Sequence, residues 1–160
     1  MKNRDVEIID AIETTGFYFI KRVSSKDVEE INRMGRHLLS ITTQIIYDIG
    51  ALTHYLETKN LPNKTTRLCP SQTEMVVENP DEILPNFIRG TQDSYLYVKR
   101  LINNSISIVE VLDKGKNLRI THGGFEVKDK KYLRKERELK KSILEGRHSF
   151  IGQPRPKSHD

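Results

Sequence analysis

Five polar residues lie within a stretch of strand-forming sequence between residues 95 and 127. They are Lys99, Arg100, Arg119, Thr121 and His122. Cleavage of RNA without a metal needs a base near the 2′-hydroxyl, an acid near the leaving 5′-oxygen, and donors on the phosphate oxygens. Histidine titrates near neutral pH, and lysine and arginine bind phosphate. These residue types therefore fit RNA cleavage, and they also fit an ordinary solvated face of a sheet.

Strand alternation separates these candidates. Side chains two residues apart on a strand point to the same face. Arg119 and Thr121 therefore share one face of their strand. His122 points with Ile120 towards the core, unless a bulge at the glycines 123–124 changes its direction.

Short turns between the strand-like segments predict an antiparallel sheet. The segments at 95–99, 105–111 and 118–121 are rich in β-branched and aromatic residues, and the composition of 113–117 is typical of a turn. Connections this short join only antiparallel neighbours. We therefore expect three to four antiparallel strands.

The first 60 residues carry helical signals. Residues 5–23 begin as a short helix and continue either as helix or as a strand. Ser24 is an expected N-cap, and apolar residues then recur at spacings of three and four from Ile31 to Leu56. This pattern predicts a long helix, kinked or broken near residue 50, which carries His54.

The remaining segments are shorter or more polar. Residues 58–74 read as a polar connector, and Pro80 should begin a short helical turn. Residues 130–145 are expected to form a charged helix with a thin apolar face, and the last residues read as a disordered tail.

The expected fold class is α+β, with N-terminal helices packed on a small antiparallel sheet and a basic helix at the C-terminus. The expected organisation is an N-terminal helical region at 1–50, an α+β domain at 51–147 and a disordered tail at 148–160.

Positive charge is concentrated in one segment. The net charge is +5, and residues 128–147 hold nine Lys or Arg against four acids, which also sums to +5. Such a balance favours polyanion partners. The expected nucleic-acid contacts are Arg100, Lys131, Arg134 and Lys135. The interleaved acids fit a solvated helix face as well.

Several classes of protein are disfavoured. The single cysteine, Cys69, excludes an intrachain disulfide and a multi-cysteine zinc site. No metal site and no cofactor are expected. No apolar run approaches the roughly 18 residues that span a bilayer, and the N-terminus lacks the apolar core of a signal peptide. We therefore expect a cytoplasmic protein with no membrane partner.

The order of motifs resembles the phage-associated nucleases of the barnase–EndoU–colicin–RelE (BECR) superfamily. Those proteins place one or two helices before a four-stranded antiparallel sheet. The resemblance covers roughly residues 50–135. Its matching pieces are His54 in LTHYL, the NPDEI motif at 79–83, Lys99 in YLYVK and Thr121 in RITHGGF. The departures are a long connector after His54 and the glycine pair after His122.

The resemblance implies a metal-independent ribonuclease or toxin of phage or mobile-element type, which acts on RNA. His54 or His122 would transfer protons, Lys99 and Arg119 would bind phosphate, and Thr121 would donate to a phosphate oxygen. An antitoxin or another protein would be a partner of such a toxin.

Two alternatives use the same residues differently. The first is a non-catalytic regulator that binds nucleic acid or protein through a basic sheet face and the C-terminal helix. The second is an interaction module in which the long helix forms a homodimer.

Overall fold

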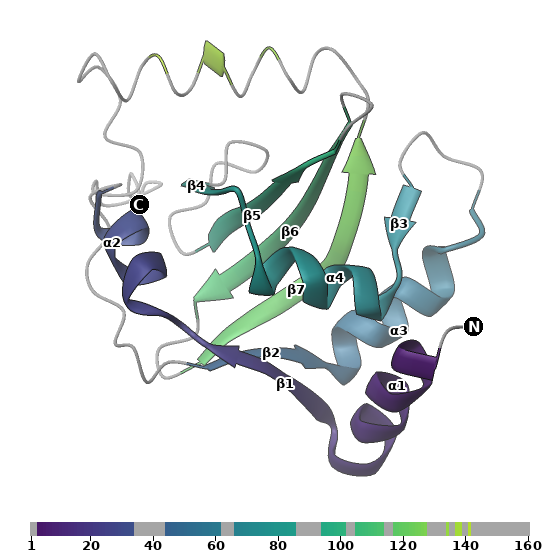
Figure 1. Cartoon of the computed structure of the whole chain (residues 1–160). Helices are drawn as coiled ribbons and strands as arrows, with labels where there is room; N and C mark the ends of the chain where they lie inside the picture. The colour runs from purple at the N-terminus through teal and green to yellow at the C-terminus, as the bar shows by residue number, and fades with distance from the viewer. Residues whose placement is uncertain are drawn as a thin grey trace, which may run out of the picture.

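The computed structural model describes residues 3–33, 44–61, 66–85, 94–101, 105–113 and 117–127, together with Arg134, Arg137, Glu138 and Lys141. These residues form four helices and seven strands (Figure 1). In chain order the elements are α1 (Asn3–Thr15), β1 (Phe17–Arg22), α2 (Ser25–Arg33), β2 (Gln44–Asp48), α3 (Ile49–Thr58), β3 (Thr66–Leu68), α4 (Pro70–Glu78), β4 (Glu82–Pro85), β5 (Ser94–Arg100), β6 (Ile106–Asp113) and β7 (Asn117–Val127).

All seven strands belong to one sheet, in the order β1-β2-β7-β6-β5-β4, with β3 also paired to β7. Among themselves, the five strands β3 to β7 pair antiparallel. The antiparallel ribbon of β1 and β2 joins them through a parallel pairing of β2 with β7. The α+β class and the antiparallel strands of the sequence prediction are therefore confirmed, but the sheet holds more strands than the three or four expected.

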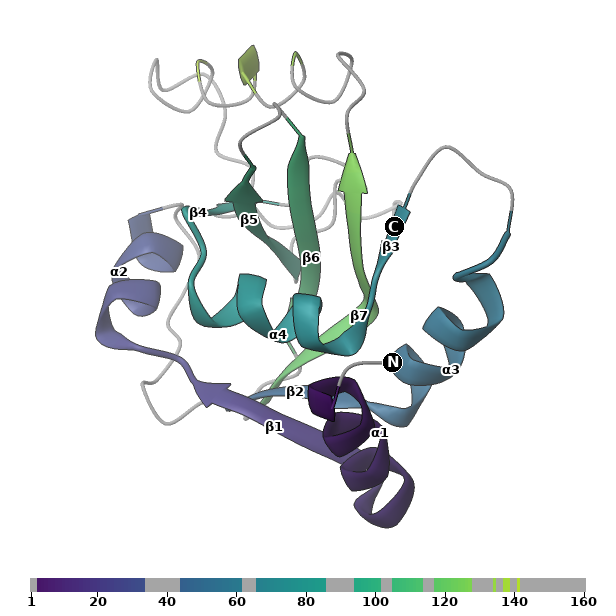
Figure 2. The same ribbon diagram turned by 45° about the vertical axis from the view of Figure 1, so that its right-hand side comes forward.

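The helices cover one face of this sheet. Figure 2 shows α4 across its middle, α1 and α3 near one end and α2 near the other. The main core lies between the two layers and includes residues of all four helices. Its helical members are Ile8, Ile12, Ile31, Ala51, Leu52, Val76 and Val77, and its strand members include Tyr47, Tyr95, Tyr97, Val109 and Ile120.

A second apolar cluster lies on the opposite face of the sheet. It consists of Leu84, Leu96, Val98, Ile106, Ile108 and Val127, with Phe125 packed against it. Along β5, Tyr95 and Tyr97 point to the helices, and Leu96 and Val98 point to this second cluster. Burial on both faces explains the unbroken run of apolar and aromatic residues from Tyr95 to Val98.

The long helix predicted from Ile31 to Leu56 is wrong. Helix α2 begins at the expected cap, where Ser24 Oγ accepts the Asp27 N–H at 3.1 Å. Residues 44–48, however, form strand β2. Their β-branched residues favour a strand when neighbouring strands are available for pairing. The long helix that was predicted to form a homodimer is therefore not one continuous helix.

Helix α3 begins directly after β2. The Asp48 carboxylate accepts the Ala51 N–H at 2.9 Å and caps it. The boundary predicted near residue 50 falls at this junction, and side chains from both sides of it share the main core. The predicted N-terminal helical region therefore contains two strands of the common sheet.

The polar connector predicted at 58–74 is also wrong, because it contains the start of α4. Cys69 is the N-cap and Pro70 the first helical residue, and the Gln72 side chain accepts the Cys69 N–H at 2.9 Å. Instead of a helical turn at Pro80, residues 82–85 form β4, which pairs with β5. Prediction of β4 from sequence would require knowledge of its partner.

The predicted C-terminal basic helix and the tail at 148–160 lie largely or wholly outside the described residues. The four described residues of the basic segment have exposed side chains. No helix in the described part of the chain is long and apolar enough to cross a membrane.

A charge network ties α1 to α4. The Arg4 guanidinium donates to the buried Glu74 carboxylate at 2.6 and 2.8 Å, and the Tyr18 hydroxyl also donates to it. Burial and the Glu74 carboxylate raise the pKa of Tyr18 to about 12. Burial alone would raise the pKa of Glu74, but the hydrogen bonds from Arg4 and Tyr18 outweigh it and lower that pKa.

Replacing Glu74 by glutamine should lower the free energy of unfolding by about 1–2 kcal/mol at pH 7. The estimate is modest because the Arg4 side chain is 50% exposed. A lowered folded pKa stabilises the protein above the ordinary value of about 4.3, and this contribution is lost as the pH falls through the folded pKa. The difference between wild type and variant should therefore shrink at pH 3.

Urea denaturation at pH 7 and pH 3 measures both quantities. Glu7→Gln is the matched control, because Glu7 is an exposed partner of the same Arg4 at 3.1 Å. It should change stability by less than about 0.5 kcal/mol. Equal effects of the two substitutions at pH 7 would contradict a special role for Glu74.

Candidate functional site

The pairing of β6 with β7 is interrupted at the residues that the sequence singled out. Val109 pairs with Gly124 and Val111 pairs with Ile120. Glu110 alone therefore stands opposite three residues of β7, Thr121 to Gly123. Gly123 has a φ of 69°, a left-handed backbone conformation that other residues rarely adopt. The sequence left open whether the glycines form a bulge. The strand has one at residues 121–123, directly before Gly124, and we call these residues the β7 bulge.

The other edge of β7 is also divided at this bulge. Strand β2 pairs with residues 117–120, and β3 pairs with residues 124–126. Because β6 occupies the opposite edge along its length, β2 and β3 lie on the same edge of β7, one on each side of the bulge. The chain passes from β2 to β3 through α3. The helix that carries His54 therefore bridges the two strands that flank the bulge (Figure 1).

A buried hydroxyl lies beside the bulge. Tyr47 is 0% exposed, and a Cβ placed on Gly123 would lie 3.4 Å from its Oη. This Oη has no hydrogen-bond partner among the described residues. Burial raises the pKa of Tyr47 above its ordinary value. Sequence reasoning missed Tyr47, because an isolated tyrosine in a supposed helix carries no signal.

The structure describes the side chains of some predicted catalytic residues and only the main chain of others. His54 is half-buried on α3, and its main-chain carbonyl accepts the Thr58 hydroxyl at 2.7 Å. The main chain of Arg119, Thr121 and His122 belongs to β7, but their side chains lie outside the described part of the structure. Glu110, which sequence reasoning did not select, is buried opposite the bulge.

Lys99 lies in a different place. Its ammonium donates to the Asn79 carbonyl at 3.0 Å and lies 3.7 Å from an Asp81 oxygen. It lines a cleft of about 510 Å³ whose described lining comes from the end of β1, α2, the 78–83 segment and Lys99 itself, and includes no residue of α3 or β7. The structure therefore does not bring Lys99 and His54 into one cavity.

The cleft holds a charge network that the sequence did not reveal. The Asp27 carboxylate is 2.8 Å from the Lys21 ammonium, and it accepts the Tyr97 hydroxyl at 3.3 Å. The Asp27 side chain is 6% exposed. Burial, and then the charge of Asp27, raise the pKa of Tyr97 well above its ordinary value. These contacts satisfy Asp27 internally and attach α2 to β1 and β5.

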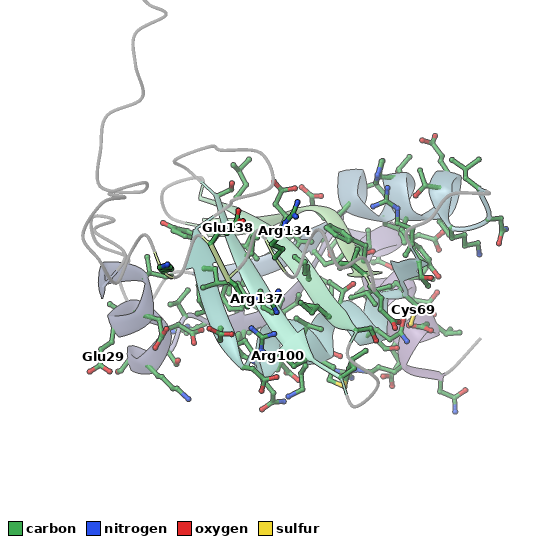
Figure 3. The ribbon with its side chains drawn as sticks, turned by 90° about the horizontal axis from the view of Figure 1, so that it is seen from above. Glu29, Cys69, Arg100, Arg134, Arg137 and Glu138 are labelled. Carbon is green, nitrogen blue, oxygen red and sulfur yellow. The ribbon has the colours of Figure 1, made fainter. Side chains whose placement is uncertain are left out.

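The predicted nucleic-acid contacts are exposed where they are described. The Arg100 guanidinium is 2.6 Å from Glu82, and the Arg134 guanidinium is 3.9 Å from Glu138. Figure 3 shows Arg100, Arg134 and Arg137 over the sheet in the view from above, with Cys69 away to one side. Lys131 and Lys135 lie outside the described residues.

Among the residues that the structure describes, no group of three or more His, Cys, Asp or Glu side chains is arranged to hold a metal ion. The comparisons with known proteins give no relative. No family model, no curated protein and no solved structure matches this chain.

Proposed function

We propose that this protein is a metal-independent ribonuclease, of the type found in phages and mobile elements, that cleaves RNA by attack of the 2′-hydroxyl. The observation that carries the proposal is the β7 bulge. Three residues against one is a large irregularity, and bulges of this kind redirect side chains next to active sites. It falls on Thr121 and His122, between the two strands that the His54 helix connects.

The proposed roles follow from residue type. One of His54 and His122 removes the proton of the 2′-hydroxyl, whose oxygen then attacks phosphorus. The other gives a proton to the 5′-oxygen as its bond to phosphorus breaks. Arg119 and Thr121 donate to the phosphate oxygens while negative charge accumulates there. The products are a 2′,3′-cyclic phosphate and a free 5′-hydroxyl, and no co-reactant is consumed.

One role changes relative to the sequence prediction, and one residue is added beside the bulge. Lys99 is assigned to the separate cleft, where Asn79 and Asp81 hold its ammonium. Tyr47 is fully buried beside Gly123 and is assigned no contact with substrate. The resemblance of the NPDEI and RITHGGF motifs to BECR nucleases supports the same reaction class. A toxin role, and an antitoxin as partner, belong to this proposal.

The direct test is cleavage of single-stranded RNA by the purified full chain in EDTA. We expect fragments that end in a 2′,3′-cyclic phosphate, and no cleavage of the same oligonucleotide carrying 2′-O-methyl groups, which lack the nucleophile. Expression in a bacterial host should slow growth. The absence of cleavage on several unrelated RNAs, together with normal growth, would reject the ribonuclease assignment.

A second candidate function is RNA binding without cleavage. Exposure of Arg134, Arg137 and Lys141 in the basic segment favours it. In that case affinity falls steeply with salt, and neutralising these residues weakens binding to all sequences alike. Binding of intact RNA in the assay above, with no products, would select this function over the nuclease.

A further inference from the structure

Two phenylalanines are exposed on the sheet face opposite the helices. Phe17 is 43% exposed and Phe19 is 41% exposed. They alternate along β1 with Tyr18 and Ile20, which belong to or pack against the main core. Side chains two residues apart share a face, so the two rings lie next to each other on the outer surface of β1, an outermost strand of the sheet (Figure 2).

The charge on this surface has one sign. Arg22 is exposed and stands opposite Gln44 of β2. The acid on these two strands is Asp48, and its carboxylate is buried as the cap of α3. The described residues of β1 and β2 therefore present two aromatic rings and a guanidinium, with no exposed carboxylate. We call Phe17, Phe19 and Arg22 the β1 platform.

We propose that the β1 platform binds single-stranded RNA, with two bases stacked on Phe17 and Phe19 and a phosphate bound by Arg22. Aromatic side chains on a sheet surface stack on any base, and a nearby cation binds the backbone. The inference deepens the proposed nuclease function, because it gives the substrate strand a binding surface, and it rests on that function for the identity of RNA.

A second copy of the chain fits this surface less well. An exposed edge strand can pair with another strand, but β1 has a register irregularity between Phe19 and Lys21. Its last residue, Arg22, is exposed, whereas Lys21 is paired with the buried Asp27. A bulge at an edge opposes pairing with a like strand, and the two Arg22 side chains would repel each other across a symmetric contact. The same positive charge attracts a nucleic acid.

The platform lies near Arg119 of the proposed active site, on the sheet face opposite the helical layer that includes α3. Phe19 stands opposite Ile46 of β2, and Ile46 stands opposite Arg119 of β7. Two strand spacings separate Phe19 from Arg119, which is about 10 Å. Arg119 precedes the β7 bulge by two residues. A strand of RNA that lies across β1 and β2 therefore reaches the bulge within a short length of chain.

The test measures binding separately from cleavage, by fluorescence anisotropy of a labelled 2′-O-methyl RNA oligonucleotide. Phe17→Leu combined with Phe19→Leu keeps apolar bulk but removes the flat rings, and it should weaken binding about tenfold or more. The double tyrosine variant should retain wild-type affinity. Arg22→Ala should weaken binding and reduce the salt dependence by about one counterion.

Met75→Ala is the matched control, because Met75 is 44% exposed on α4, in the helical layer. It should leave binding unchanged. Unchanged RNA affinity in the double leucine variant would overturn the proposal. It would also be overturned if wild type sediments as a dimer and the double leucine variant as a monomer, because the surface would then be a contact between copies. If RNA binding depends on the two phenylalanine rings but unmodified RNA is not cleaved, the platform is supported and the nuclease function is rejected. The two proposals can therefore fail separately.

Discussion

Replacing His54 with alanine should lower the rate of RNA cleavage by about 100-fold or more, while the fold and RNA binding stay intact. Proton transfer by a positioned side chain contributes about 10²–10⁴-fold to a rate. Helix α3 connects the two strands that flank the β7 bulge. His54 lies on this helix, and it is the proton-transfer candidate whose side chain the structure describes. Its half-buried position limits the structural cost of truncation.

The measurement is the single-turnover cleavage rate of a labelled RNA in EDTA. Thr53→Ala provides a matched control, because Thr53 is an exposed neighbour on the same helix. Its rate should stay within about twofold of wild type. Circular dichroism and the anisotropy assay should show that the His54→Ala variant is folded and binds RNA. Wild-type cleavage by this variant would remove His54 from the mechanism.

The Lys99→Ala variant tests whether the cleft around Lys99 contributes to RNA cleavage at the β7 bulge. The cleft around Lys99 shares no lining residue with α3 or β7 in the described part of the chain. If the bulge is the active site, the rate should change by less than about threefold. A loss comparable to that of His54→Ala would instead show that Lys99 and His54 serve one site.

The parts of the fold that depend on local chemistry could be predicted from the sequence. Ser24 caps α2 because its hydroxyl accepts the Asp27 N–H, a contact set by a three-residue spacing. The strands from Ser94 to Val127 follow one another through short connections. Connections this short join only antiparallel strands, so the pairing direction could be predicted. Two adjacent glycines in a strand indicated either a break or a bulge at this position.

The parts that depend on distant partners could not be predicted. The apolar spacing from Ile31 to Leu56 fits a helix, but it runs through α2, β2 and α3, each of which contributes apolar residues to one core. Strand β4 exists because β5 offers an edge to Glu82–Pro85. The separation of Lys99 from His54 depends on strand order, which short motifs do not encode.

Replacing Gly124 with alanine should destabilise the protein by roughly 2–3 kcal/mol. A Cβ at this position would lie 2.6 Å from Leu68 Cδ1, 2.9 Å from Val109 Cγ2 and 3.1 Å from the Ile108 carbonyl oxygen. Two of these contacts are shorter than a carbon–carbon contact allows. They come from β3 and β6, which lie on the two sides of β7, so the strand has no direction in which to move freely.

The midpoint of thermal unfolding should fall by about 5–10 °C. Gly50→Ala is the matched control, because the nearest atom to its added Cβ is Asp48 Oδ1 at 3.5 Å, an ordinary contact, and the residue lies in α3. Alanine there should be neutral or slightly stabilising. Equal midpoints for the two variants would contradict the close packing around β7.

A double-mutant cycle with Leu68 identifies the cause of the destabilisation. Leu68→Ala alone leaves a cavity in the buried position between β3 and the helices, and it costs about 2–4 kcal/mol. In the double variant the new methyl of residue 124 enters part of that cavity, so the total cost should be about 1 kcal/mol less than the sum. Simple additivity would mean that Val109 and the Ile108 carbonyl, not Leu68, exclude a side chain there. Because Gly124 directly follows the β7 bulge, a loss of RNA cleavage that exceeds the loss of folded protein in Gly124→Ala would link this packing to the active site.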